Sequence, residues 1–153
     1  MENYFNIKDL KNIVFIGYHD DFEKLIKINK LLKINTIIVT SKSQKINIKK
    51  GINYQLFSNL DNKFNKIIKN KVKTNKNLFF SISSRWIFKQ NQIQEVFNNN
   101  LVNFHPSRLP LDAGGGGYSW RILNSNRICN LLIHHVNKDI DSGPIVFSEE
   151  SIF

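Results

Sequence analysis

The amino-terminal part of the chain places an amphipathic segment between two hydrophobic runs, and this order restricts the fold more than any other feature. Residues 13–18 form a continuous apolar run, and residues 35–41 form a second one rich in β-branched side chains. Between them, apolar residues recur at helical spacing over residues 22–32, opposite a row of lysines. Continuous apolar strands suit a sheet that is buried on both faces. The order strand, helix, strand therefore predicts a βαβ unit with parallel pairing and a right-handed crossover.

The remaining segments continue this alternation as far as Pro110 and then change character. The last two predicted strands are joined by a loop that is too short for a crossover helix, so they are expected to pair antiparallel. The sequence predicts a Rossmann-like α/β fold: one domain over residues 1–153, with a mostly parallel open sheet, helices on both faces and an antiparallel pair near the carboxyl terminus. The further predicted strands are residues 54–57, 78–82, 101–105, 129–136 and 145–147, and the further helices lie near residues 60–72, 93–97 and 118–123.

The chain is strongly basic, but its charge pattern is not typical of a nucleic-acid-binding protein. Lysine and arginine total 22 against 12 aspartate and glutamate residues, which gives a net charge of +10. The excess is mostly lysine, scattered among asparagine and isoleucine rather than gathered in an arginine-rich face with interleaved aromatic residues. Nucleic acid is therefore not the expected partner, and the charge indicates only an attraction for anionic small molecules.

Cysteine usage and hydropathy point to the cytoplasm. Cys129 is the single cysteine, so the chain has no internal disulfide framework. Residues 1–4 lack a signal-peptide pattern, and no apolar run approaches the length that spans a membrane. We therefore expect a cytoplasmic protein without a membrane partner.

Polar residues accumulate where the predicted strand 101–105 ends at Pro106. Asn103 and His105 are two residues apart and share one face of the strand, while Phe104 lies on the other. Pro106 stops the strand and leaves His105 at its carboxyl end, where open α/β folds keep their chemistry. A solvent-facing strand end is the alternative interpretation. The pairing of an amide that can bind an oxyanion with an imidazole that can accept a proton favours a functional one.

Asp141 lies in the loop between the last two predicted strands. Because Ser142-Gly143 follows it, a turn-forming role is one interpretation. The other is that its carboxylate reaches His105, holds the imidazole in one tautomer and favours its charged form. The sequence does not decide between them.

The glycine run 114–117 precedes a predicted helix with two aromatic residues. It is not followed by Lys-Ser or Lys-Thr, and it does not match the dinucleotide fingerprint. A loop with close backbone packing and a ligand-binding loop are equally compatible with it. Tyr118 and Trp120 at the helix start can present an aromatic face to a sugar, and the helix start can receive an anion.

Two neighbouring histidines occupy the predicted strand 129–136. His134 and His135 must point to opposite faces, so one of them is expected to be buried or to face the site. With no cysteine or glutamate at ligand spacing, no metal site is expected. Arg85, after the strand 78–82, can bind an anion or form a surface ion pair.

The sequence Asn103-Phe104-His105-Pro106-Ser107, the following Leu-Pro, the glycine loop and Asp139-Ile140-Asp141-Ser142-Gly143-Pro144-Ile145 together resemble the folate-dependent formyltransferase family. The family includes glycinamide ribonucleotide, methionyl-tRNA and sugar N-formyltransferases. The resemblance is specific over residues 78–146. It implies the formyltransferase fold, in a domain that is shorter at its carboxyl end than is usual for the family.

The resemblance also implies roles for individual residues. An amine would attack the formyl carbon of 10-formyltetrahydrofolate, with His105 as base or proton shuttle, Asn103 binding the oxyanion and Asp141 orienting His105. His134 matches a second histidine of the purine enzyme, which lies seven residues before the aspartate. The implied folate contacts are Ser84, Arg85, Trp86, Ile87 and the backbone around Ile140, and the implied acceptor contacts are Gly115, Gly116, Tyr118, Trp120 and His134.

The segment 114–123 looks most like the sugar N-formyltransferases. This likeness implies a small-molecule amine acceptor, a nucleotide-linked amino sugar of surface-glycan biosynthesis. Three alternatives stay open: glycinamide ribonucleotide as acceptor, a non-catalytic folate- or nucleotide-binding remnant, and a basic nucleic-acid-binding domain. A homodimer is compatible with the sequence, which does not test it.

Overall fold

A seven-stranded sheet forms the centre of the computed structural model, which describes residues 5, 7, 9–18, 22–41, 54–57, 59, 61–71 and 76–152. The strand order is β3-β2-β1-β4-β5-β6-β7. The strands are β1 (Asn12–Gly17), β2 (Asn35–Ser41), β3 (Tyr54–Phe57), β4 (Asn77–Ile82), β5 (Leu101–His105), β6 (Ile128–His135) and β7 (Ile145–Ile152).

The pairing in this sheet confirms the predicted fold class. Strands β1 to β5 run parallel to their neighbours, whereas β6 pairs antiparallel with both β5 and β7. The strand order reverses at β1, because β2 and β4 lie on its two sides. At the amino ends of these strands, Asn12 joins both neighbours: its Nδ2 donates to Asn77 Oδ1 at 2.7 Å, and its Oδ1 accepts from Asn35 Nδ2 at 3.3 Å.

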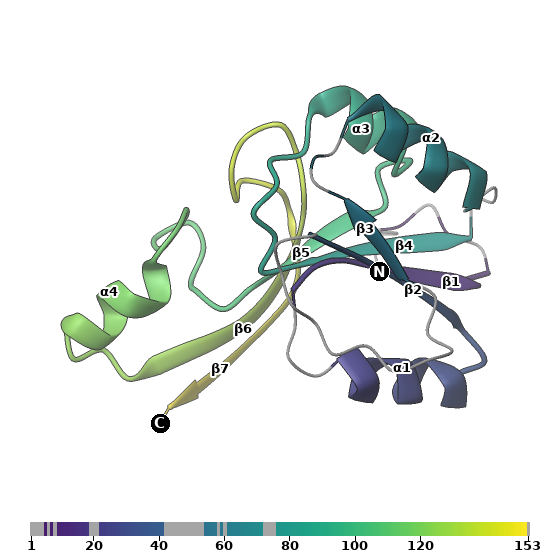
Figure 1. Cartoon of the computed structure of the whole chain (residues 1–153). Helices are drawn as coiled ribbons and strands as arrows, with labels where there is room; N and C mark the ends of the chain where they lie inside the picture. Colours follow the sequence, from purple (N-terminus) through teal and green to yellow (C-terminus); the bar gives the residue numbers. More distant parts are fainter. Residues whose placement is uncertain are drawn as a thin grey trace.

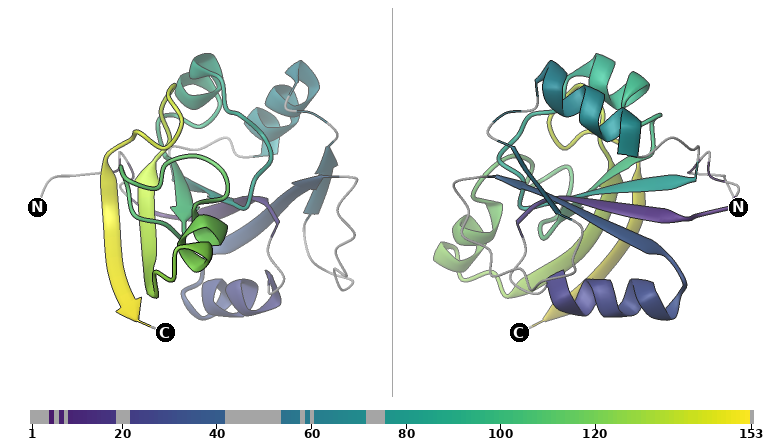
Figure 2. Two further views of the ribbon diagram at one scale, coloured as in Figure 1. Left: turned by 90° about the vertical axis from the view of Figure 1, so that its left-hand side faces the viewer. Right: turned by 45° about the vertical axis from the view of Figure 1, so that its right-hand side comes forward.

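Helices cover both faces of the parallel part of the sheet, as predicted. Helix α1 (Phe22–Leu31) lies on one face, and α2 (Asn62–Lys71) and α3 (Gln90–Glu95) lie on the other (Figures 1 and 2). The core under α2 and α3 is the larger of the two and is rich in phenylalanine. Phe97, fully buried, has its ring centroid 4.9 Å from that of Phe79 and 5.6 Å from that of Phe88.

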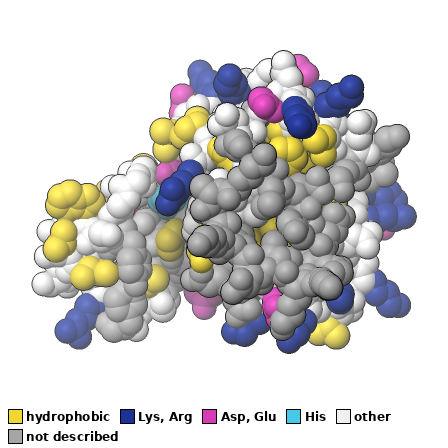
Figure 3. Space-filling view, in the orientation of Figure 1, with side chains coloured by type: hydrophobic (Ala, Val, Ile, Leu, Met, Phe, Trp, Pro, Cys, Tyr) yellow, Lys and Arg dark blue, Asp and Glu magenta, His cyan; other side chains and the backbone are white. Residues whose placement is uncertain are grey.

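The carboxyl-terminal elements extend away from this helix-covered body. Helix α4 (Gly117–Leu123) lies beside β6 (Figures 1 and 2). Hydrophobic side chains gather at this outer end (Figure 3), where Trp120, Ile122 and Leu123 are exposed. Lysine and arginine side chains are spread over the visible surface rather than concentrated (Figure 3).

Strand β7 is longer than the sequence indicated. The apolar residues predicted a strand over 145–147, but β7 continues to Ile152 through Ser148-Glu149-Glu150-Ser151. These polar residues pair with residues 129–132 of β6. Backbone hydrogen bonds to β6 extend the strand past the point where hydrophobic side chains stop marking it, because ladder pairing does not require side-chain burial on the outer face. Within the described residues, every helix is too short and too polar to cross a lipid bilayer.

The aromatic packing around Phe97 gives a test of the core. We expect Phe97→Ala to lower the free energy of unfolding by about 3–5 kcal/mol, because it removes a fully buried ring and leaves a cavity. The matched control is Phe147→Ala on β7, where the side chain is 43% exposed, and its cost should stay below about 1 kcal/mol. Urea denaturation measures both values. Equal losses for the two variants would contradict this assignment of the core.

Candidate active site

The antiparallel pairing of β5 with β6 brings the predicted polar residues together. In this register Asn103 lies opposite His134, and His105 lies opposite Leu132. Asn103 Nδ2 is 3.3 Å from His134 Nε2. The amide and the second histidine therefore meet at the carboxyl end of β5, although 31 residues separate them in sequence.

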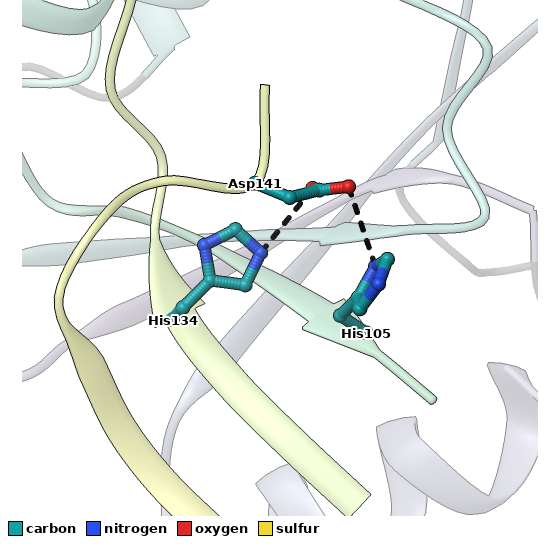
Figure 4. Close-up of side chains that lie close together, drawn as sticks. All are labelled: His105, His134 and Asp141. Atoms are coloured by element: carbon teal, nitrogen blue, oxygen red, sulfur yellow. Dashed lines mark ion pairs between the residues drawn. The ribbon is translucent and has the colours of Figure 1, made fainter. Parts of the chain in front are cut away.

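His105 sits at the end of β5 with only 8% of its surface exposed. Its Nε2 lies 3.2 Å from the backbone oxygen of Asp112. Because a carbonyl oxygen only accepts, this contact requires a proton on Nε2. The other ring nitrogen, Nδ1, faces Asp141 Oδ2 at 3.7 Å (Figure 4). The Asp141 carboxylate therefore lies next to His105, as required if Asp141 is to orient the imidazole.

His134 is more deeply buried, with 2% of its surface exposed. Its Nδ1 donates to the backbone oxygen of His135 at 2.8 Å, and its Nε2 lies 3.5 Å from Asp141 Oδ1 (Figure 4). Burial lowers the pKa of His134 below its usual value, against smaller opposing effects of the His135 carbonyl and the Asp141 carboxylate. The ring is therefore neutral near pH 7, with its lone pair on Nε2. His135 points the other way and packs against Phe5, as the alternation of β6 predicts.

Asp141 is held in place from both sides of its loop. The backbone N–H of Gly114 donates to Asp141 Oδ2 at 2.8 Å, so the glycine loop contacts the carboxylate directly. The loop itself is closed by Ser142 Oγ, which is 2.7 Å from Asn137 Oδ1. Gly143 then passes so close to β6 that a Cβ there would overlap the backbone oxygen of His135. The Asp-Ser-Gly-Pro sequence thus does more than form a turn.

A pocket of about 410 Å³ opens beside these groups, a size within the range of small-molecule sites. Its walls come from the segment after β4, the end of β5, the glycine loop and the loop before β7. Of the predicted site residues, those that line it are Ser84, Trp86, Ile87, Asn103, His105, Gly115, His134, Ile140 and Asp141.

Three of the predicted residues that the structure describes do not line this pocket. Arg85 and Gly116 are exposed, and Trp120 is 64% exposed on α4. The Trp120 ring still packs near Gly116, because a Cβ on that glycine would be 3.6 Å from it. Tyr118 belongs to α4, and its side chain lies outside the described residues.

Two residues that support the site were not predicted from sequence. Asp112 supplies the carbonyl that contacts His105, and its carboxylate accepts from Arg108 Nε at 3.2 Å. Arg121, almost fully buried, donates to the carbonyls of Pro106, at 2.8 Å, and Ile128. It thereby ties the end of the His105 motif to the start of β6. Backbone carbonyls leave no signal in a sequence, so neither role was visible there.

No family model matches the chain. In sequence it is 40% identical over 53 residues to the methionyl-tRNA formyltransferase of Mycoplasma genitalium and 36% identical over 55 residues to that of Mycoplasma pneumoniae. These matches cover 35% and 36% of this chain but only 17% and 18% of the two relatives. The chain thus matches less than a fifth of the length of these curated relatives.

Solved structures match over almost the whole chain. A glycinamide ribonucleotide transformylase from Geobacillus kaustophilus superposes with a TM-score of 0.75 at 14% identity, covering 94% of this chain and 84% of that one. A phosphoribosylglycinamide formyltransferase from Bacillus halodurans gives 0.73 at 16% identity, with 94% and 80% covered. The sugar 3N-formyltransferase WlaRD, solved in the presence of dTDP and 5-N-formyl-THF, gives 0.67 at 18% identity, with 94% and 53% covered.

These similarities confirm the predicted resemblance to the folate-dependent formyltransferases. At such low identity the structural matches establish the fold, which is the fold of these enzymes.

The contact between Gly143 and β6 can be tested by adding one methyl group. We expect Gly143→Ala to lower the free energy of unfolding by about 1–3 kcal/mol, because the new Cβ must push the Asp141 loop away from the His135 carbonyl. Gly115→Ala is the control: a Cβ there meets nothing within 4 Å, so its effect should stay within about 0.5 kcal/mol. Chemical denaturation compares the two. A loss confined to Gly115→Ala would refute the docking of this loop.

Burial of His134 also predicts a pH dependence of stability. Since its folded-state pKa lies below the ordinary value of 6.5, the unfolded chain binds more protons as the pH falls. The stabilisation is fully present above the unfolded-state pKa and is lost progressively below it. Denaturation at pH about 7.5 and about 5.5 should therefore show a decrease in the wild type that is smaller in His134→Gln. An equal decrease in the free energy of unfolding of both proteins would show that His134 does not cause the pH dependence.

Proposed function

We propose that this chain is a folate-dependent N-formyltransferase, which moves a formyl group from 10-formyltetrahydrofolate to the amine of a nucleotide-linked amino sugar. The observation that carries the proposal is the meeting of Asn103, His105 and Asp141 at one pocket. An amide donor, an imidazole and a carboxylate are the groups that acyl transfer to an amine requires. The fold of the known formyltransferases supports the same reaction.

The reaction begins with attack of the acceptor nitrogen on the formyl carbon. The electron pair of the C=O double bond moves onto the oxygen, which becomes an oxyanion, and an N–H of Asn103 Nδ2 stabilises it. The attacking nitrogen must lose a proton, which His105 accepts. The intermediate then collapses: the C–N bond to folate N10 breaks, and that nitrogen takes up the proton. The products are the N-formyl acceptor and tetrahydrofolate.

The surroundings of His105 fit a residue that becomes protonated during this sequence. A protonated ring can donate from Nε2 to the Asp112 oxygen and from Nδ1 to the Asp141 carboxylate at the same time. The 3.7 Å separation from Asp141 is longer than a hydrogen bond, and such contacts often tighten only when substrate is bound. Asp141 is thus placed to stabilise the charge that His105 acquires.

The two substrates are assigned to different walls of the pocket. Trp86, Ile87 and Ile140 provide an apolar surface for the pterin ring, with Ser84 and backbone groups beside it. Gly115 and His134 also line the pocket, and we assign to them the region where the acceptor amine approaches His105. Trp120, packed near the glycine loop, is the aromatic group available to the sugar or base of a nucleotide-linked acceptor.

Glycinamide ribonucleotide is the second candidate acceptor. His134 precedes Asp141 by the spacing that the purine enzyme shows, and the proteins that share this fold include a phosphoribosylglycinamide formyltransferase and a glycinamide ribonucleotide transformylase. The two acceptors share the donor and the chemistry, so only their turnover distinguishes them.

Turnover with a panel of acceptors tests the proposal. The chain is incubated with 10-formyltetrahydrofolate and, separately, nucleotide-linked amino sugars, glycinamide ribonucleotide, methionyl-tRNA or no acceptor, and tetrahydrofolate, formate and N-formyl product are measured. N-formyl amino sugar as the main product supports the proposal. Formate release that needs no acceptor would identify a deformylase instead, and folate binding without turnover would identify a non-catalytic protein.

Replacement of His105 tests its role. We expect His105→Ala to lower kcat by about 10² or more, because a positioned general base typically contributes 10²–10⁴-fold. His135→Ala is the matched control, since that histidine lies opposite Val102 and is not part of the pocket lining. It should retain nearly full activity. Full activity of His105→Ala would overturn the assignment.

A further inference from the structure

We propose that His105, His134 and Asp141 together bind one divalent transition-metal ion, with Zn²⁺ as the representative. The three side chains offer two imidazole nitrogens and a carboxylate oxygen that all lie within 4.8 Å of one another. No metal-binding motif marks this site in the sequence, since successive ligands are 29 and 7 residues apart along the chain. The pairing of β5 with β6 and the docked Asp141 loop create it.

The protonation of both rings leaves their lone pairs facing Asp141. His105 Nε2 contacts the Asp112 carbonyl and His134 Nδ1 contacts the His135 carbonyl, so each of these nitrogens carries the proton. In the neutral rings the remaining nitrogens, His105 Nδ1 and His134 Nε2, are unprotonated. Metal-binding histidines are held in this way, with the distal N–H donated to a carbonyl or carboxylate. The far side of each ring is therefore already arranged as it would be around a metal.

Two ring nitrogens face the two oxygens of the Asp141 carboxylate, and a positive charge between them would be favourable. His105 Nδ1 lies 3.7 Å from Asp141 Oδ2, and His134 Nε2 lies 3.5 Å from Asp141 Oδ1. A single proton can bridge only one of these two contacts at a time, whereas one metal ion can bind the atoms of both. The Gly114 N–H that holds Asp141 Oδ2 at 2.8 Å fixes the carboxylate without competing for this position.

The separations are near those of a tetrahedral zinc site. Bonds of about 2.0–2.1 Å at a tetrahedral ion place neighbouring ligand atoms about 3.3–3.4 Å apart. Each ring nitrogen lies at a similar distance from one carboxylate oxygen, 3.5 Å for His134 Nε2 and 3.7 Å for His105 Nδ1, but the two oxygens differ. The three ligand atoms lie within 4.8 Å of one another, so the side chains must move closer together to hold one ion. Two histidines and one carboxylate are a ligand set that zinc uses when its fourth position is open, and the pocket beside the three residues provides that opening.

The ligand types also determine which ions are accepted. Imidazole favours Zn²⁺, Co²⁺ and similar ions, whereas Mg²⁺ requires oxygen ligands and a nearly octahedral geometry. One carboxylate and two neutral imidazoles leave a bound Zn²⁺ with a net charge of +1. Binding would also replace the contact between His134 Nε2 and the Asn103 amide. The metal and the proposed formyl transfer would then compete for the same nitrogens.

Isothermal titration of the full chain with ZnCl₂ tests the proposal, in a Cys129→Ser background that removes the lone thiol. We expect one Zn²⁺ per chain and no comparable binding of MgCl₂. His134→Gln and Asp141→Asn should each weaken binding by about tenfold or more, since either removes a ligand rather than an outer partner. His135→Gln removes a histidine outside the cluster and should leave the affinity unchanged.

The visible spectrum of the Co²⁺-substituted protein gives a second readout that needs no variant at the site. Intense d–d bands of a tetrahedral ion are expected, and Zn²⁺ should displace them. The proposal is overturned if Co²⁺ shows only the weak spectrum of an octahedral ion, or if Zn²⁺ binds equally well to folded His134→Gln and Asp141→Asn. Both measurements are made without folate or acceptor, so their outcome is independent of whether the chain transfers formyl groups.

Discussion

The pairing of β5 with β6 is the interaction on which the rest of the site depends. The strands before β5 are parallel, so the β4–β5 pairing alone would place Asn103 beside Ser81 of β4, with no histidine opposite. Because β6 returns antiparallel, His134 lies directly across from Asn103, and the loop after β6 passes over the end of β5. Antiparallel pairing allows short connections on this side, and one of them carries Asp141.

Close backbone packing then converts this topology into a defined geometry. The loop after β6 can approach the sheet only because Gly143 has no Cβ, and His135 N–H is 2.9 Å from the Pro144 oxygen. On the other side, Arg121 joins the carbonyls of Pro106 and Ile128. These contacts involve mostly main-chain atoms. The site is therefore held by the backbone, and its titratable side chains are left to face one another and the pocket.

Much of the fold could be predicted from the sequence, because buried parallel strands and amphipathic helices leave strong periodic signals. The end of the strand follows from Pro106, which cannot continue it. The opposite orientations of His134 and His135 follow from the alternation of side chains along a strand. The sequence could not reveal contacts made by carbonyl groups, such as those of Asp112 and His135, or the length of β7, whose outer half is polar. It also could not reveal that Arg85 and Trp120 lie outside the pocket lining. Whether a loop or a short helix turns toward a pocket depends on its packing against residues that are distant in sequence.

The arrangement of charges explains why two histidines and one aspartate occur together in so buried a place. Isolated polar groups at this depth would be costly, but each imidazole here has one nitrogen satisfied by a main-chain carbonyl, and the carboxylate has the Gly114 N–H. The remaining lone pairs, those of His105 Nδ1 and His134 Nε2, face the Asp141 carboxylate, and that of His134 is also contacted by the Asn103 amide. A proton or a cation placed among these atoms would be stabilised by the carboxylate. The transfer of a proton from a substrate amine and the capture of a metal ion, as we propose them, are two chemical uses of the same group of atoms.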